Sequence, residues 1–138
     1  MIQNIPLVAL LLIGVTVLVS LNGFKNDSFF LKYHFLIHKI KAGEYFRLLT
    51  SGFLHVSITH ILFNMVTFYF FVNIVVDGLG NFPFLVLYFG SLLGGNIFAY
   101  LFHFNDPYYS AVGASGAVTG VLFSALLLYP GIELMLFF

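Results

Sequence analysis

The chain has 138 residues, of which 61% are hydrophobic and 7% are charged, and its mean hydropathy is +1.05. Soluble proteins carry about 25% charged residues, so this composition excludes an ordinary soluble domain and indicates a multi-pass integral membrane protein. Five basic residues balance five acidic ones and cysteine is absent, which argues against a nucleic-acid partner and excludes disulfide and thiolate chemistry.

The first predicted span covers residues 5–21 and begins beside Asn4 and Pro6, which suit the start of a helix. A secretory signal is rejected because no basic segment precedes the span. The span has 17 residues, which is also longer than the roughly 7–15 residues of a signal's hydrophobic region. This span is therefore expected to stay in the membrane.

The connection over residues 22–47 holds all five basic residues, interleaved with aromatic ones. Such a mixture predicts a partly helical loop at the level of the lipid headgroups. His34 and His38 lie there with a spacing of four, and we interpret them as solvated surface histidines. Counting charges alone would place this loop in the cytoplasm.

Three further apolar runs predict spans over residues 52–76, 82–104 and 115–129. A fifth run begins at Ile132, but its seven residues would rise only about 10 Å as a helix. The expected fold is an all-α polytopic bundle with four complete transmembrane helices and the start of a fifth. It would form a single membrane domain over residues 1–138, truncated at its C-terminus.

Small and polar residues inside these runs predict close contacts between helices. Gly116 and Gly120 form a small-xxx-small pair, and Asn73 and Asn96 are expected to form interhelical hydrogen bonds. The third span has a similar flat face of glycines, namely Gly90, Gly94 and Gly95.

Polar side chains mark two helix beginnings that should open on the same face. His55, His60 and Asn64 stand in the first turns of the second predicted span, and Ser115 opens the fourth. Consecutive spans alternate direction, so the second and fourth run the same way. His60 and Asn64, four residues apart, share a helix face, whereas His55 should point away and brace a neighbouring loop.

This arrangement predicts an oxyanion-binding site. The first backbone N–H groups of a helix lack intrahelical partners and carry the positive end of its dipole. The Ser115 N–H, the His60 imidazole and the Asn64 amide could together stabilise a developing oxyanion. Metal binding is the alternative for the histidines, but the spacing of five between His55 and His60 misses that of helical zinc ligands, and we expect no metal or cofactor.

At these residues the chain resembles the rhomboid family of intramembrane serine proteases. The resemblance implies a six-span core in which Ser115 is the nucleophile and a histidine on the sixth span is the general base. His60 and Asn64 would then be oxyanion donors and the first connection would lie in the outer leaflet. Structural support would come from Arg47, His55, Gly113, Gly116 and Gly120. The matching pieces are Gly43–Ser51, Phe53–His55 with His60 and Asn64, Gly113–Gly116 with Gly120, and Tyr129–Pro130.

The family implies cleavage of transmembrane segments of membrane protein substrates, in the lipid bilayer and most simply in a bacterial cytoplasmic membrane. The general-base histidine has no counterpart in these 138 residues, so we expect this polypeptide to be inactive and the complete protein active. Thr119 replaces a frequent aromatic residue, and residues 73–77 depart from the family's glycine and glutamate.

Two other functions remain open. One is a catalytically inactive rhomboid-like adaptor that binds transmembrane helices. A small transporter or channel subunit has less support, because no acidic residue lies mid-span.

Overall fold

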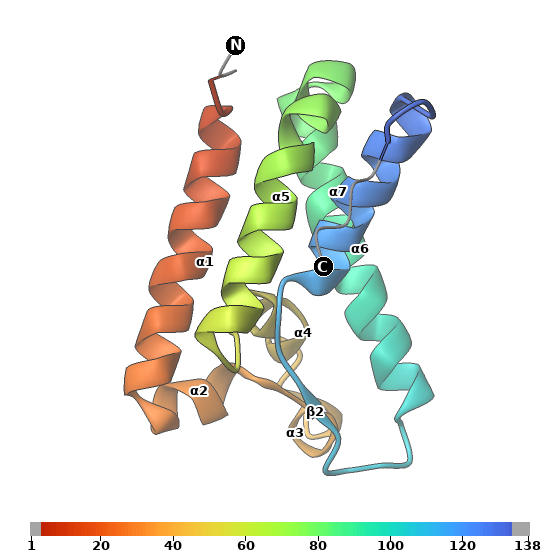
Figure 1. Cartoon of the computed structure of the whole chain (residues 1–138). Helices are drawn as coiled ribbons and strands as arrows, with labels where there is room; N and C mark the ends of the chain where they lie inside the picture. The colour runs from red at the N-terminus through yellow and green to blue at the C-terminus, as the bar shows by residue number, and fades with distance from the viewer. Residues whose placement is uncertain (1–3, 134–138) are drawn as a thin grey trace.

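The computed structural model describes residues 4–133, and most of them lie in helices. Figure 1 shows the longer helices side by side, with the short elements gathered at one end of the bundle. The helices are α1 (Leu7–Lys25), α2 (Asp27–Tyr33), α3 (Ile37–Lys41), α4 (Arg47–Thr50), α5 (Ile58–Leu79), α6 (Asn81–Phe102) and α7 (Ser115–Leu128). Two short strands, β1 (Phe35–Leu36) and β2 (Ser110–Ala111), and a 3-10 turn over Ser51–Phe53 complete the fold.

Three of the helices, α1, α5 and α6, are long and apolar enough to cross a membrane. The fourth predicted span corresponds to α7, which is apolar but has only 14 residues. At about 1.5 Å per residue it extends about 21 Å, less than the roughly 30 Å hydrocarbon core. Four complete spans are therefore not confirmed. The predicted fifth run begins at Ile132, and from residue 134 onward it lies outside the described residues.

The second span begins later than predicted, at Ile58 rather than at Gly52. Ser57 is the N-cap of α5, and its hydroxyl accepts a hydrogen bond from the His60 backbone N–H at 3.1 Å. A serine in this position satisfies one of the free N–H groups of a helix and so fixes its start. The preceding apolar residues form the 3-10 turn and a short extended segment.

The first connection is partly helical, as predicted, but it also pairs with a distant segment. Strand β1 lies antiparallel to β2, with Phe35 opposite Ala111 and Leu36 opposite Ser110. Phe35, Ile37 and Ile40 form a fully buried cluster beneath this pair. The connection thus has a small core of its own, and it holds the segment that leads into α7.

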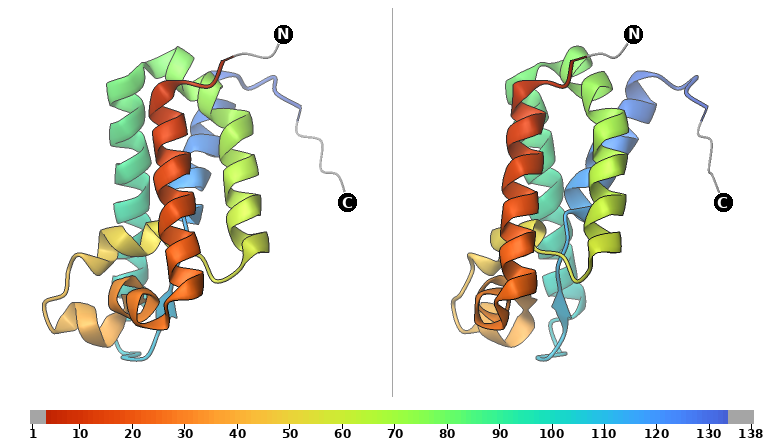
Figure 2. Two further views of the ribbon diagram at one scale, coloured as in Figure 1. Left: turned by 90° about the vertical axis from the view of Figure 1, so that its left-hand side faces the viewer. Right: turned by 60° about the vertical axis from the view of Figure 1, so that its left-hand side comes forward.

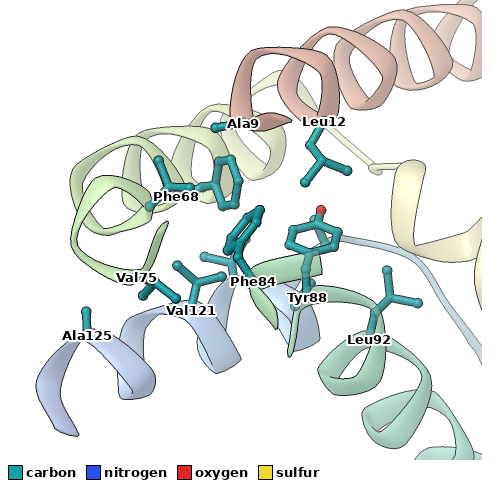
Figure 3. Packing of buried hydrophobic residues seen from close by; sticks show 13 residues of the cluster. Ala9, Leu12, Phe68, Val75, Phe84, Tyr88, Leu92, Val121 and Ala125 are labelled. Carbon is teal, nitrogen blue, oxygen red and sulfur yellow. The ribbon is translucent and has the colours of Figure 1, made fainter. Parts of the chain in front are cut away.

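The main core lies where α1, α5, α6 and α7 meet (Figure 3). Phe68, Phe84 and Tyr88 pack there as aromatic neighbours, with centroid separations of 5.7–6.2 Å. Figure 2 shows α7 alongside both α5 and α6. The apolar interior therefore holds α7 at a fixed depth in the bundle.

Glycines bring α6 and α7 together, as predicted for Gly116 and Gly120. A Cβ built on Gly120 would lie 2.1 Å from Ser91 Oγ, and one on Gly95 would lie 3.9 Å from Gly116 Cα. The prediction was wrong for Gly90 and Gly94, where a Cβ would meet nothing within 4 Å. Only one face of a helix can contact a given neighbour, and those two glycines lie outside it.

Two further predictions for polar residues need correction. His34 is buried, and its Nδ1 lies 2.9 Å from the Leu31 carbonyl. Burial lowers its pKa below the ordinary value of 6.5, so it is not a solvated histidine. Asn96 donates to the Leu48 carbonyl at 2.7 Å, as an interhelical asparagine should, but the buried Oδ1 of Asn73 has no partner among the described residues.

Candidate functional site

The helices α5 and α7 run in the same direction and begin at the same end of the bundle (Figure 1). Ser115 is the first residue of α7, while His60 and Asn64 lie in the first two turns of α5. All three line one cavity of about 670 Å³ between these helices. The structure thus brings the predicted hydroxyl, imidazole and amide groups to a common space.

Gly113 allows the His60 ring to lie against the segment that precedes Ser115. Its φ is +128°, a conformation that residues with a side chain rarely adopt. A Cβ at this position would lie 2.8 Å from His60 Cε1 and 3.0 Å from Nε2. Both the backbone conformation and the close ring therefore require glycine here.

His55 is fully buried but lies outside α5, in the segment before the Ser57 cap. The prediction that it points away from His60 was wrong, because the two residues do not share a regular helix. Their rings meet edge to face, with centroids 4.8 Å apart. His55 Nε2 accepts a hydrogen bond from the Ala114 N–H at 3.4 Å, directly before Ser115.

The Asn64 side chain already uses both of its N–H groups. Nδ2 contacts the His60 carbonyl and His55 Nε2, each at 3.2 Å. Because a carbonyl can only accept, the atom facing it must be Nδ2 rather than Oδ1. Asn64 therefore binds the His55 ring and the His60 backbone carbonyl, and it can donate to a third group only by releasing one of these partners.

Backbone N–H groups around Ser115 differ in availability. Gly113 N–H donates to the Ser51 carbonyl at 3.0 Å, and Val118 N–H donates to the Ala114 carbonyl at 2.9 Å. The intervening N–H groups of Ser115 and Gly116 lie in the first turn of α7, where helices lack internal acceptors. Such N–H groups can bind an anion.

The Ser115 side chain is exposed to the cavity. Among residues 4–133, no histidine side chain forms a hydrogen bond with Ser115; the histidine hydrogen bonds go to other partners. Serine is a weak nucleophile without an adjacent base. Within the described residues, the Ser115 hydroxyl therefore faces the cavity without a hydrogen-bonded base.

Burial lowers the pKa of His55 to about 4, and the neighbouring His60 adds to this effect. Desolvation disfavours the charged form of a histidine. His55 is therefore neutral near pH 7, as required for its Nε2 to accept the Ala114 N–H.

A second, smaller cavity of about 210 Å³ borders Ser115 on the side of α6. Ser51 and Asn96 contribute polar groups to it, and the Asn96 amide donates to Ser51 Oγ at 3.2 Å. Ser51 ends the piece Gly43–Ser51 that resembles the family, and its polar side chain near the start of the second predicted span is expected to line the access of water to the site.

Arg47 is buried and organises the first connection. Its Nε lies 2.6 Å from Glu44 Oε2, and its Nη1 donates to the carbonyls of Leu31 and His34 at 2.9 and 2.8 Å. The guanidinium also keeps the pKa of the Glu44 carboxyl below its usual value. These contacts join α2 to α4, whereas the cavity beside Ser115 is lined by other residues.

Comparison with known proteins identifies a family. Residues 42–138 match the model of the Rhomboid domain. The putative rhomboid protease YdcA of Bacillus subtilis is 42% identical over 82 residues, which are 59% of this chain and 40% of YdcA. RHOMBOID-like protein 12, mitochondrial, of Arabidopsis thaliana is 33% identical over 118 residues, 74% of this chain and 35% of that protein.

A third relative is the rhomboid protease GluP of Bacillus subtilis, 39% identical over 83 residues, 60% of this chain and 16% of GluP. The chain thus spans less than half the length of each of these relatives. They come from a bacterium and a plant, so the similarity supports an integral membrane protein without selecting a bacterial membrane.

Proposed function

Since the chain belongs to the rhomboid family, we propose that it carries the nucleophile and oxyanion-binding side of an intramembrane serine endopeptidase. Its substrates would be membrane proteins, cut within or beside a transmembrane segment. The observation that supports this proposal most directly is the shared cavity of Ser115, His60 and Asn64 between two parallel helices.

In the proposed reaction, Ser115 Oγ attacks the carbonyl carbon of the scissile peptide bond and the carbonyl oxygen becomes an oxyanion. The Ser115 N–H and the His60 ring donate to this oxyanion, and His60 Nδ1 is a buried nitrogen that has no partner among the described residues. Asn64 joins them by releasing one of its present bonds. Loss of one such donor typically lowers the rate by about 10²–10³-fold.

The proton of Ser115 needs a base, which we propose to be a histidine outside the described residues, as in the six-span core of the family. That histidine would later protonate the leaving amine. Water would then attack the acyl-enzyme, with the polar cavity beside Ser51 and Asn96 adjacent to the ester.

The larger cavity is suited to an unwound apolar segment. Aromatic residues of α5 line one side and aliphatic residues of α7 line the other; they include Phe63, Phe70, Phe71, Val118 and Leu122. Phe63 and Phe70 are also largely exposed at the surface of α5. A substrate could therefore enter from the lipid and place a peptide bond near Ser115.

The test is covalent labelling by a fluorophosphonate reagent, which reacts with activated serines, in membranes that contain the protein as its gene encodes it. We expect labelling of the wild type and none of Ser115→Ala. Ser110→Ala is the matched control, because this serine is also exposed and lies five residues upstream. Labelling that persists in Ser115→Ala would overturn the nucleophile assignment.

The second candidate is a catalytically inactive adaptor that binds transmembrane helices. It is favoured by one observation, that both N–H groups of Asn64 are already used. An adaptor would bind a transmembrane peptide carrying a photocrosslinker but would leave Ser115 unlabelled. A protease would show both crosslinking and labelling.

A further inference from the structure

Helix α1 lies outside residues 42–138, which match the family model, yet it contributes a polar side chain next to the site. Ser20 is fully buried on α1, and its Oγ lies 2.9 Å from His55 Nδ1. The same hydroxyl donates to the Phe53 carbonyl at 2.7 Å. A serine within an otherwise apolar span thus contacts the histidine that holds Ala114.

The partners of His55 determine which ring nitrogen carries the proton. Nε2 faces the Ala114 N–H and the Asn64 amide, and both of these groups are donors. It must therefore be the bare acceptor nitrogen, so the proton of the neutral ring lies on Nδ1. The Nδ1–H then donates to Ser20 Oγ, whose own proton is directed to the Phe53 carbonyl.

We propose that Ser20 is a positioning residue, which accepts the His55 Nδ1–H and thereby holds this ring, Asn64 and the segment before Ser115 in place. The role in catalysis rests on the function proposed above, whereas the tautomer assignment does not. One chain of hydrogen bonds joins α1, the segment before α5, α5 itself and the start of α7.

Removing the hydroxyl would undo this chain in a defined way. Without Ser20 Oγ, the Nδ1–H is a buried donor with no acceptor, and the ring can relieve this by turning or by carrying its proton on Nε2 instead. That N–H would face two donors, from Ala114 and Asn64, and both contacts would become repulsive. The Asn64 amide and the backbone before Ser115 would then be free to move.

The chain offers a matched control on the same helix. Thr16 is also fully buried, one turn before Ser20, and the hydrogen bonds of His55 do not include it. Thr16→Ala removes a hydroxyl at a similar depth while leaving His55 untouched. Ser20→Thr keeps the hydroxyl and should preserve the wild-type behaviour.

The first measurement is nitrogen NMR of the protein in detergent with ¹⁵N-labelled histidine at neutral pH, which distinguishes the two tautomers. The His55 signals are assigned by their loss in His55→Gln. We expect the Nδ1–H tautomer and similar His55 signals in wild type, Ser20→Thr and Thr16→Ala. In Ser20→Ala we expect a changed His55 Nδ1 signal, because the hydrogen bond to Ser20 is lost or the proton moves to Nε2. The signals of the other histidines report whether each variant is folded.

The second measurement is the rate of fluorophosphonate labelling of Ser115. We expect a loss of about 5-fold in Ser20→Ala, in line with a hydrogen bond of ordinary net strength, and near-normal rates in Ser20→Thr and Thr16→Ala. An Nε2–H tautomer in the wild type, or an unchanged His55 Nδ1 signal in Ser20→Ala, would overturn the proposal. If no variant labels, the protease function fails while the NMR result still decides the role of Ser20.

Discussion

At the scale of single residues, a substitution at Gly113 can distinguish the effect of backbone strain from the effect of displacing the His60 ring. Gly113→Ala should abolish Ser115 labelling, because the new Cβ would displace the His60 ring 2.8 Å away. The control is Gly43→Ala: Gly43 also has a positive φ, +103°, but a Cβ there meets nothing within 4 Å. Both substitutions cost about 1–3 kcal/mol of strain, and labelling should be lost only in Gly113→Ala. Equal loss in both would refute the contact.

The pH dependence of stability should reflect His55. Its pKa is about 4 in the folded protein and 6.5 ordinarily, so below pH 6.5 the folded state binds fewer protons than the unfolded state. The free energy of unfolding should be highest above pH 6.5, should decrease as the pH drops to 4, and should then level off. A shift of this size corresponds to about 3 kcal/mol.

Thermal unfolding in detergent at several pH values checks this prediction. His55→Gln removes the titrating group and should flatten part of the fall. Burial also lowers the pKa of His34. This residue should account for some of the remaining loss of stability, so His34→Gln is the companion variant. Stability that rises as the pH falls from 6.5 to 4 would contradict the prediction.

Residue patterns predicted part of the site. Ser115, His60 and Asn64 share a cavity because helix direction and the four-residue spacing are geometric rules that sequence alone reveals. The predicted orientation of His55 was wrong, because α5 begins only after the Ser57 cap and its helical periodicity does not extend back to His55. Ser20 was missed because its partner lies 35 residues away, although a serine inside an apolar span is itself a signal.

At the scale of helices, the contact between α6 and α7 makes a prediction about packing. Gly120→Ala places a Cβ 2.1 Å from Ser91 Oγ and 2.6 Å from its Cβ. Overpacking of this kind costs typically 1–3 kcal/mol, so we expect a lower unfolding temperature. Ser91→Gly should restore most of the loss, because it removes both clashing atoms.

The control is Gly90→Ala on α6, where a Cβ has open space and should leave stability unchanged or slightly higher. The coupling between Gly120 and Ser91 is measured by thermal unfolding of the single variants Gly120→Ala and Ser91→Gly and of the double variant that combines them. Additive losses in the double variant would show that the two positions do not touch.

Helix existence was easier to predict than helix ends or long-range pairing. Long apolar runs predicted α1, α5 and α6 because hydropathy alone specifies them. The pairing of β1 with β2 joins residues about 75 positions apart, and each strand has two residues, too few for an alternating pattern. The burial of His34 likewise depends on Arg47, a contact between separate elements.

At the scale of the whole molecule, the charges are unevenly placed. All five basic residues lie in the first connection or beside it, at the end of the bundle where α5 and α7 begin (Figure 1). Asp77 lies in the last turn of α5, and Glu133 follows α7. The positive-inside rule would put the basic end in the cytoplasm. The family resemblance implies the opposite, with this end and the site facing outward.

Labelling of single cysteines decides between these orientations, because the chain contains no native cysteine. Tyr108 is 84% exposed in the loop at the basic end, and Gly131 is exposed after α7 at the other end. We expect a membrane-impermeant maleimide to label Tyr108→Cys in intact cells and to label Gly131→Cys only after the membrane is opened. Both should react in detergent, which controls for accessibility. The reverse pattern would mean that the lysines set the topology, and that the cavity of Ser115 opens toward the cytoplasm.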